Sequence, residues 1–175
     1  MARFVPTPFT VGVHDLMHRP GEQREKLLDI VLSEQMGEGL VAVPQGGHMH
    51  LEVRLESVHE GILATVDVDT EASGECGRCL EPLTEVVQVD IQELFAYSLD
   101  EAFDYCVTDD HVDLGQMVRD AVVLALPFQP VCRPECAGLD PETGERRSEG
   151  QAQTPGESID PRWAALHKLA SEQDS

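Results

Sequence analysis

Hydrophobic and polar residues alternate along two neighbouring stretches in the first half of the chain. Apolar residues occupy every second position in residues 51–55 and again in residues 62–68, and a turn containing Gly61 separates the two stretches. Alternation with period two on both sides of a glycine turn is typical of an antiparallel hairpin with one buried face. Residues 87–95 repeat the alternation. The pattern therefore predicts a three-stranded antiparallel meander.

Shorter apolar segments before this hairpin predict further strands. Residues 9–13 are typical of an entry strand, and residues 39–44 of a short strand that ends at Pro44. Residues 26–32 are ambiguous between strand and helix, but their short length and β-branched residues favour a strand. Residues 98–112 are rich in acidic side chains and predict a loop.

One helix is predicted near residues 113–126. Asp113 and Gln116 have the spacing of a capping box. Pro127 ends the helix. The positions with helical spacing are Leu114, Met117, Val118, Ala121, Leu124 and Ala125. We therefore expect an α+β fold: an antiparallel β-sheet or partly closed β-barrel, with this helix packed on its apolar face and a short C-terminal helix.

Three regions follow from the composition along the chain. Residues 1–139 form the β-rich domain, and residues 140–159 form a flexible linker that lacks apolar periodicity. Residues 160–175 predict a short helical motif, because Asp160 and Pro161 suit a helix start. Its apolar stripe, which includes Trp163, either docks on the domain or anchors a partner, and docking is the favoured interpretation.

Four of the five cysteines form two close pairs, Cys76 with Cys79 and Cys132 with Cys136. Two sulfurs at this spacing can bind one metal ion from a single turn, and two such turns complete the tetrahedral four-sulfur site that zinc prefers. Disulfides are disfavoured because no export signal or membrane segment is evident, so we expect a reducing cytoplasmic location. Unmetallated buried thiols and a redox motif remain alternatives. Cys106 has no partner nearby and is interpreted as a small, partly buried side chain.

The charge is strongly negative, with a formal net charge of −21 and a pI near 4.4. No lysine or arginine occurs between Arg78 and Arg119. The acidic residues of this interval are either a solvated loop and face or a docking surface for a basic protein. The candidate partner-binding residues are Asp100, Glu101, Asp104, Asp109, Asp110 and, outside the interval, Trp163. No catalytic motif is evident, so we expect a protein that is not an enzyme.

Four stretches together resemble the YceD family, whose members are described as large ribosomal RNA subunit accumulation proteins. They are Gly74–Pro82 (GECGRCLEP), Gln92–Phe95 (QELF), Arg119–Leu139 (RDAVVLALPFQPVCRPECAGL) and Asp160–Leu166 (DPRWAAL). The resemblance implies a bacterial cytoplasmic protein, of the actinobacterial type, that is needed for synthesis, processing or stability of 23S rRNA. It also implies a gene often placed beside one for a small basic ribosomal protein. Many relatives carry a third cysteine pair where this chain has Asp140 and Thr143.

The implied role and the charge together favour an indirect action on rRNA. A chain this acidic repels bare phosphate, because affinity for nucleic acid depends on lysine and arginine. We therefore expect a ribosomal or rRNA-processing protein of basic character as the partner, with no membrane involved. The alternatives are a zinc or thiol redox sensor that uses the cysteine pairs, and an acidic nucleic-acid mimic that occupies a basic groove.

Overall fold

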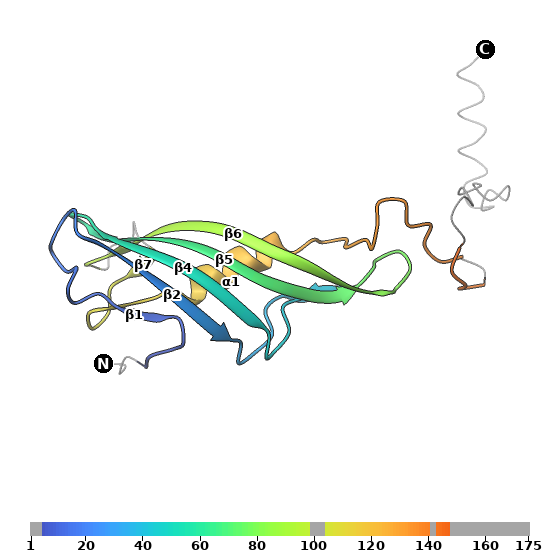
Figure 1. The fold of residues 1–175 in the computed structure, drawn as a ribbon, viewed down its shortest axis with the longest axis horizontal. Coiled ribbons are helices and arrows are strands. Elements are labelled where there is room, and N and C mark those ends of the chain that lie inside the picture. The colour runs from blue at the N-terminus through green and yellow to red at the C-terminus, as the bar shows by residue number, and fades with distance from the viewer. Residues whose placement is uncertain (1–4, 99–103, 141–142, 148–175) are drawn as a thin grey trace, which may run out of the picture. The chain divides into compact units, whose positions relative to one another are not determined.

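The computed structural model describes residues 5–98, 104–140 and 143–147 (Figure 1). The chain divides into two compact units, Met1–Cys132 and Arg133–Ser175. The predicted C-terminal helix at residues 160–175 and most of the predicted linker lie outside the described residues.

The first unit contains eight strands and one helix in its described part. Their bounds are β1 Thr10–Gly12, β2 Gln23–Val31, β3 Val41–Ala42, β4 His48–Ser57, β5 Gly61–Glu75, β6 Pro82–Ala96, β7 Tyr105–Cys106, β8 His111–Asp113 and α1 Gly115–Ala125. The main sheet has the order β2-β4-β5-β6-β7, and β3 pairs with the far end of β5. Strands β1 and β8 form a separate small sheet.

The predicted meander is confirmed. Leu51 of β4 pairs with Val68 of β5, which in turn pairs with Val89 of β6, and both pairings are antiparallel. Residues 26–31 form most of β2, as the β-branched composition predicted, and the strand ends one residue before the predicted end at 32. The sheet is open, because β2 and β7 lie at opposite edges and no pairing within the described residues joins them. Figure 1 shows β2, β4, β5 and β6 as one twisted layer. Of the two predicted architectures, the structure has the open sheet.

The core lies on one face of this sheet. Side chains alternate between buried and exposed along β4, from buried Met49 to buried Leu55. Helix α1 packs against β6 on the buried side through Met117, Val118 and Val122. The helix packed near residues 113–126 is therefore confirmed. No helix in the described residues combines the length and the apolar character that crossing a membrane requires.

The details of the helix differ from the prediction in two ways. The capping box is wrong: Asp113 accepts the N–H of Gly115 at 2.9 Å, whereas the Gln116 amide turns to Asp120. The helical stripe is also shifted at its C-terminal end, because Leu124 is 86% exposed and Val122 is buried in its place. The shift follows from the short contact between α1 and the sheet, since the last helical turn extends beyond the buried surface.

The predicted loop at residues 98–112 is partly wrong. Residues 105–106 form β7, which pairs in parallel with the end of β6, and β8 pairs with β1. Asp109 and Asp110 form a tight turn between Thr108 and His111, both with positive φ. Aspartate tolerates this left-handed conformation better than most residues.

The described part of the second unit is a compact turn. Leu139 pairs with Arg146, and the Asp140 N–H donates to the Glu145 carbonyl at 2.7 Å. The Asp140 carboxylate accepts the N–H of Thr143 at 3.0 Å and lies 3.5 Å from the Arg147 guanidinium. The side-chain oxygens of Asp140 and Thr143 therefore stabilise this turn by accepting backbone N–H groups.

Candidate metal centre

The long β5–β6 hairpin positions the first cysteine pair. Each strand has 15 residues, and the turn at their end carries Cys76 and Cys79. The Cys76 N–H donates to the Glu81 carbonyl at 2.8 Å, and the Leu80 N–H donates to the Cys76 carbonyl at 2.9 Å. Leu80 has a φ of 58°, which lets the chain reverse direction directly after Cys79.

A glycine lets a second strand approach the base of this turn. Gly74 pairs with Val41 of β3, and the Glu75 N–H donates to the Leu40 carbonyl at 2.9 Å. A Cβ atom at position 74 would lie only 1.9 Å from that carbonyl oxygen. The glycine that begins the family-like stretch is therefore required by close backbone contact, two residues before the first sulfur ligand.

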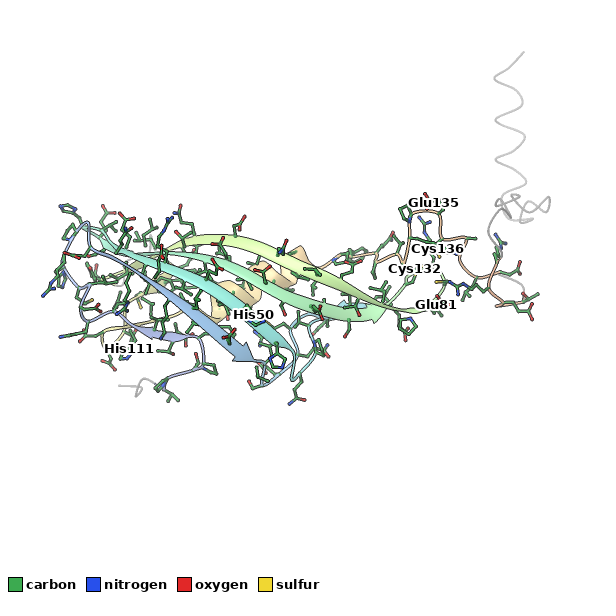
Figure 2. The ribbon with its side chains drawn as sticks, in the orientation of Figure 1. His50, Glu81, His111, Cys132, Glu135 and Cys136 are labelled. Atoms are coloured by element: carbon green, nitrogen blue, oxygen red, sulfur yellow. The ribbon has the colours of Figure 1, made fainter. Side chains whose placement is uncertain are left out.

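The segment after α1 brings the third cysteine to this turn. The Gly77 N–H donates to the Pro130 carbonyl at 2.8 Å, and the Cys132 N–H donates to Cys76 Sγ at 3.4 Å. Figure 2 labels Cys132 and Glu81 at the turn end of the hairpin. Two segments that are more than fifty residues apart in sequence therefore meet at the Cys76 sulfur.

The sulfur geometry fits a metal ion. The Sγ atoms of Cys79 and Cys132 are 3.7 Å apart. The ligand atoms of Cys76, Cys79, Cys132 and Cys136 all lie within 4.8 Å of one another. A tetrahedral ion with bonds of about 2.3 Å to sulfur requires about 3.8 Å between sulfurs. Four close cysteines of this kind could hold a metal ion, and the donor set is compatible with zinc.

The surroundings of Cys76 favour the thiolate form that metal binding needs. Its pKa is lowered from the ordinary value to about 6, chiefly because the backbone N–H of Cys132 points at the sulfur. The backbone N–H groups of Arg78 and Cys79 act in the same direction, whereas burial opposes them. Backbone N–H groups at a turn thus offset the loss of water around a buried sulfur.

Cys106 lies outside the cluster. It is half-buried in β7, and its Sγ is 3.7 Å from the Thr108 hydroxyl. This position agrees with the interpretation of Cys106 as a small, partly buried side chain.

The structure describes only part of the acidic segment that was predicted to bind a partner. Asp100, Glu101 and Trp163 lie outside the described residues. Asp104 and Asp109 are exposed, and the Asp110 carboxylate is 2.9 Å from His14 Nδ1. The described acidic side chains therefore lie on the surface, and one of them has a histidine partner.

Sequence reasoning missed a larger acidic surface on the solvent face of the main sheet. We call it the acidic sheet face, and its members are Glu25, Asp29, Glu52, Glu56, Asp67, Asp69, Glu71 and Asp90. Arg54 is the one lysine or arginine that the register places among them. The polar positions of the alternating pattern contain these acidic residues. The pattern was interpreted only for its apolar positions, which locate the core.

Two carboxylates on this face lie directly opposite each other. Asp67 of β5 pairs with Asp90 of β6, and Glu52 of β4 lies across from Asp67 on the other side. The pKa of Asp67 is raised, first by a hydrogen bond shared with the Asp90 carboxyl, then by desolvation and the neighbouring negative charges. Like charges directly opposite each other destabilise a sheet, so this row is not explained by the stability of the fold.

Comparisons with known proteins place the chain in context. The model of the family described as large ribosomal RNA subunit accumulation protein YceD matches residues 64–170. The Mycobacterium tuberculosis protein Rv2926c is 45% identical over 99% of this chain and 87% of its own length. The Mycobacterium leprae protein ML1660 is 33% identical, covering 94% and 78%, and Bacillus subtilis YlbN is 28% identical, covering 62% and 69%. No solved structure matches the chain significantly.

Proposed function

This chain belongs to the YceD family, and we propose that it is a non-enzymatic ribosome-biogenesis factor that supports synthesis, processing or stability of 23S rRNA by binding a basic protein partner. The family description supplies the role in rRNA accumulation and mentions no catalytic activity. The observation that supports a basic partner is the acidic sheet face, combined with a net charge of −21.

Direct binding of RNA is disfavoured by the same charges. Affinity for a phosphate backbone depends on lysine and arginine that displace counterions, and the acidic sheet face contains Arg54 alone among carboxylates. A ribosomal or rRNA-processing protein of basic character has the complementary charge. The effect on large-subunit rRNA is then indirect, through the stability or delivery of that partner.

In this proposal zinc has a structural role. Cys76, Cys79, Cys132 and Cys136 hold the ion, which joins the end of the β5–β6 hairpin to the segment that follows α1. Structural zinc sites contribute directly to folding energy, so the ion fixes a part of the molecule that has few buried apolar side chains.

We expect the acidic segment around residues 100–110 to accelerate association with the partner. A variant that carries Asn or Gln at Asp100, Glu101, Asp104, Asp109 and Asp110 should bind the partner about tenfold more slowly at low salt, because charge complementarity acts mainly on the association rate. Asn is suited to positions 109 and 110, where φ is positive. The measurements are the association rate with captured ribosomal proteins at two salt concentrations, and the 23S rRNA level when the variant replaces the parent in cells.

The control for this experiment removes the same charge elsewhere. It neutralises five exposed carboxylates that lie outside the acidic sheet face, at Glu22, Glu38, Glu60, Asp120 and Glu145. If both variants lose rate equally, net charge rather than the acidic segment governs association. If the first variant restores 23S rRNA as well as the parent does, residues 100–110 are a solvated loop.

A second candidate function is a thiol redox sensor. The observation that favours it is the separation of 3.7 Å between the sulfurs of Cys79 and Cys132, which allows a disulfide after a small movement. Formation of that bond removes two electrons and two protons, which an added oxidant such as diamide accepts, and it would release any bound metal.

Oxidation separates the two candidates. In a structural zinc site, we expect zinc-loaded protein exposed to equimolar diamide to keep its metal, and peptide mapping to find no disulfide between Cys79 and Cys132. A rapid disulfide between these residues, with metal release and recovery on addition of a thiol, would favour the sensor instead.

A further inference from the structure

The free edge of β6 is the longest unpaired strand edge in the described part of the molecule. Strand β6 has 15 residues, but β7 covers only Phe95 and Ala96 at one end. Figure 1 shows β6 along one border of the sheet and β2 along the other. Among the described residues, no strand pairs with the outer side of β6 between residues 83 and 94.

The direction of the backbone groups along β6 follows from two hydrogen bonds. The Glu81 carbonyl accepts the Cys76 N–H on the β5 side, and the Ala96 carbonyl accepts the Val107 N–H on the β7 side. Backbone groups alternate between the two sides of a strand, so odd-numbered residues of β6 face β5 and even-numbered residues face the open edge. The residues that present an N–H donor and a C=O acceptor to this edge are Thr84, Val86, Gln88, Asp90 and Gln92.

The edge of β6 lacks several of the features that protect strand edges from pairing, and the charged residues that it carries, Glu85, Asp90 and Glu93, are all acidic, so they oppose an acidic strand but not a basic one. Natural proteins place lysine, proline or a bulge on such edges. Residues 83–94 contain no lysine, arginine or proline, and their register with β5 is continuous. The opposite edge is different, because β2 is shorter and carries Arg24 and Lys26. The two edges of one sheet are therefore built differently, and only one is suited to accept a strand.

The charges beside this edge select its occupant. Glu85, Asp90 and Glu93 lie on β6 itself, and Asp67 lies directly across from Asp90. A second copy of the chain would bring two such acidic edges together, and each copy carries a net charge of −21. A segment with lysine or arginine at alternate positions would instead place cations on the solvent face, beside Asp90 and Asp67. Glu85 and Glu93 lie on the other face, because they pair with the buried residues Ala72 and Ala64.

We propose that the open edge of β6, from Thr84 to Gln92, is the docking site of a basic, extended polypeptide segment that joins the sheet as an additional strand. This inference rests on the proposed function and specifies how the basic partner is held. Main-chain hydrogen bonds supply affinity, and the carboxylates of β6 and β5 supply charge selectivity. The pairing of Asp67 with the Asp90 carboxyl already raises the pKa of Asp67, and the charge of Arg54 opposes this only in part.

The test uses the full-length protein and a synthetic peptide of alternating lysine and valine, about ten residues long, which is the length of a long strand. The control peptide has the same sequence with alternate amides N-methylated, which keeps the charge but removes strand pairing. We expect the unmodified peptide to bind at least about tenfold more tightly at near-physiological salt, because several backbone hydrogen bonds are lost on methylation. Equal binding of the two peptides would overturn strand addition and leave only attraction between opposite charges.

Two matched proline variants locate the binding edge. Val86→Pro removes an outward N–H from β6, and Leu27→Pro removes an outward N–H from β2; both side chains are exposed, at 68% and 74%. Proline is tolerated where the N–H faces solvent. Val86→Pro should abolish the preference for the unmodified peptide, whereas Leu27→Pro should keep it. The reverse result would place the docking site on β2 and overturn the proposal.

Amide hydrogen exchange gives an independent reading of the same edge. Addition of the unmodified peptide should slow exchange at the outward amides of Val86, Gln88 and Asp90 and leave the inward amides of β6 unchanged. If these amides become protected in the absence of peptide, and the protection increases with protein concentration, the protein associates with itself through this edge. That result would overturn the proposal of a basic partner. If these peptide results are negative while ribosomal proteins are still captured in a salt-dependent way, the proposed function stands and only the docking site is wrong.

Discussion

Replacing Cys76 with serine is expected to abolish zinc binding and to lower the free energy of unfolding by at least about 4 kcal/mol, the range associated with loss of a structural metal. Cys76 is fully buried, and its sulfur accepts N–H groups from Cys132 at 3.4 Å and from Arg78 at 3.4 Å. Serine would leave these donors facing a smaller, more weakly metal-binding oxygen. The loss should therefore affect the metal and the hydrogen bonds that join the two segments.

The measurements are metal content and stability of the same preparations. Protein purified without chelator should contain about one zinc per chain by elemental analysis, which a four-cysteine site implies. Urea unfolding should show a large decrease in stability both for the Cys76→Ser variant and for the parent after chelation. The two decreases should not add, because they remove the same ion.

Cys106→Ser is the matched control for this prediction. Cys106 is also a cysteine in a partly buried strand, but it lies outside the cluster. This variant should keep the metal and lose little stability. Reduced parent protein that carries no metal would contradict the zinc site, and an equal effect of both serine variants would show a general need for thiols in the fold.

The elements that the sequence predicted best are those with a strong local pattern. Strand β4 alternates along its whole length and β5 and β6 along most of theirs, because one face of an open sheet is buried and the other is solvated. The same alternation could have located the acidic sheet face. That surface was missed because it depends on the register between strands, which brings Glu52, Asp67 and Asp90 into one row although they are far apart in the sequence.

The elements that were predicted poorly depend on contacts between distant segments. Strand β7 has two residues and exists because it pairs with the end of β6, and no local pattern indicates it. The capping box failed because Gln116 found a partner within the helix at Asp120. For the metal centre, the spacing within each cysteine pair suggested the ligands, whereas the contact of Pro130 with Gly77 that brings the segments together could not be read from the sequence.

Two phenylalanines, one buried and one exposed, are expected to differ strongly in their effect on stability. Phe95, near the end of β6, is 1% exposed, pairs with Ile62 and lies 5.4 Å from the Tyr105 ring, measured between ring centroids. Phe95→Ala should destabilise the protein by about 3–5 kcal/mol, because it leaves a cavity where β7 joins the sheet. Phe128, directly after the proline that follows α1, is 92% exposed.

Phe128→Ala should therefore change stability by less than about 0.5 kcal/mol, as surface substitutions usually do. Chemical unfolding of the two variants in zinc-loaded protein measures the contrast, and metal content should stay the same in both, because neither side chain belongs to the cysteine cluster. If both substitutions have equally small effects, strand β7 and the adjoining end of β6 separate from the sheet at little cost in free energy. A large loss of stability in Phe128→Ala would instead show that other residues or a partner cover this ring in solution. Those residues would then have to be identified before the segment after α1 is treated as free surface.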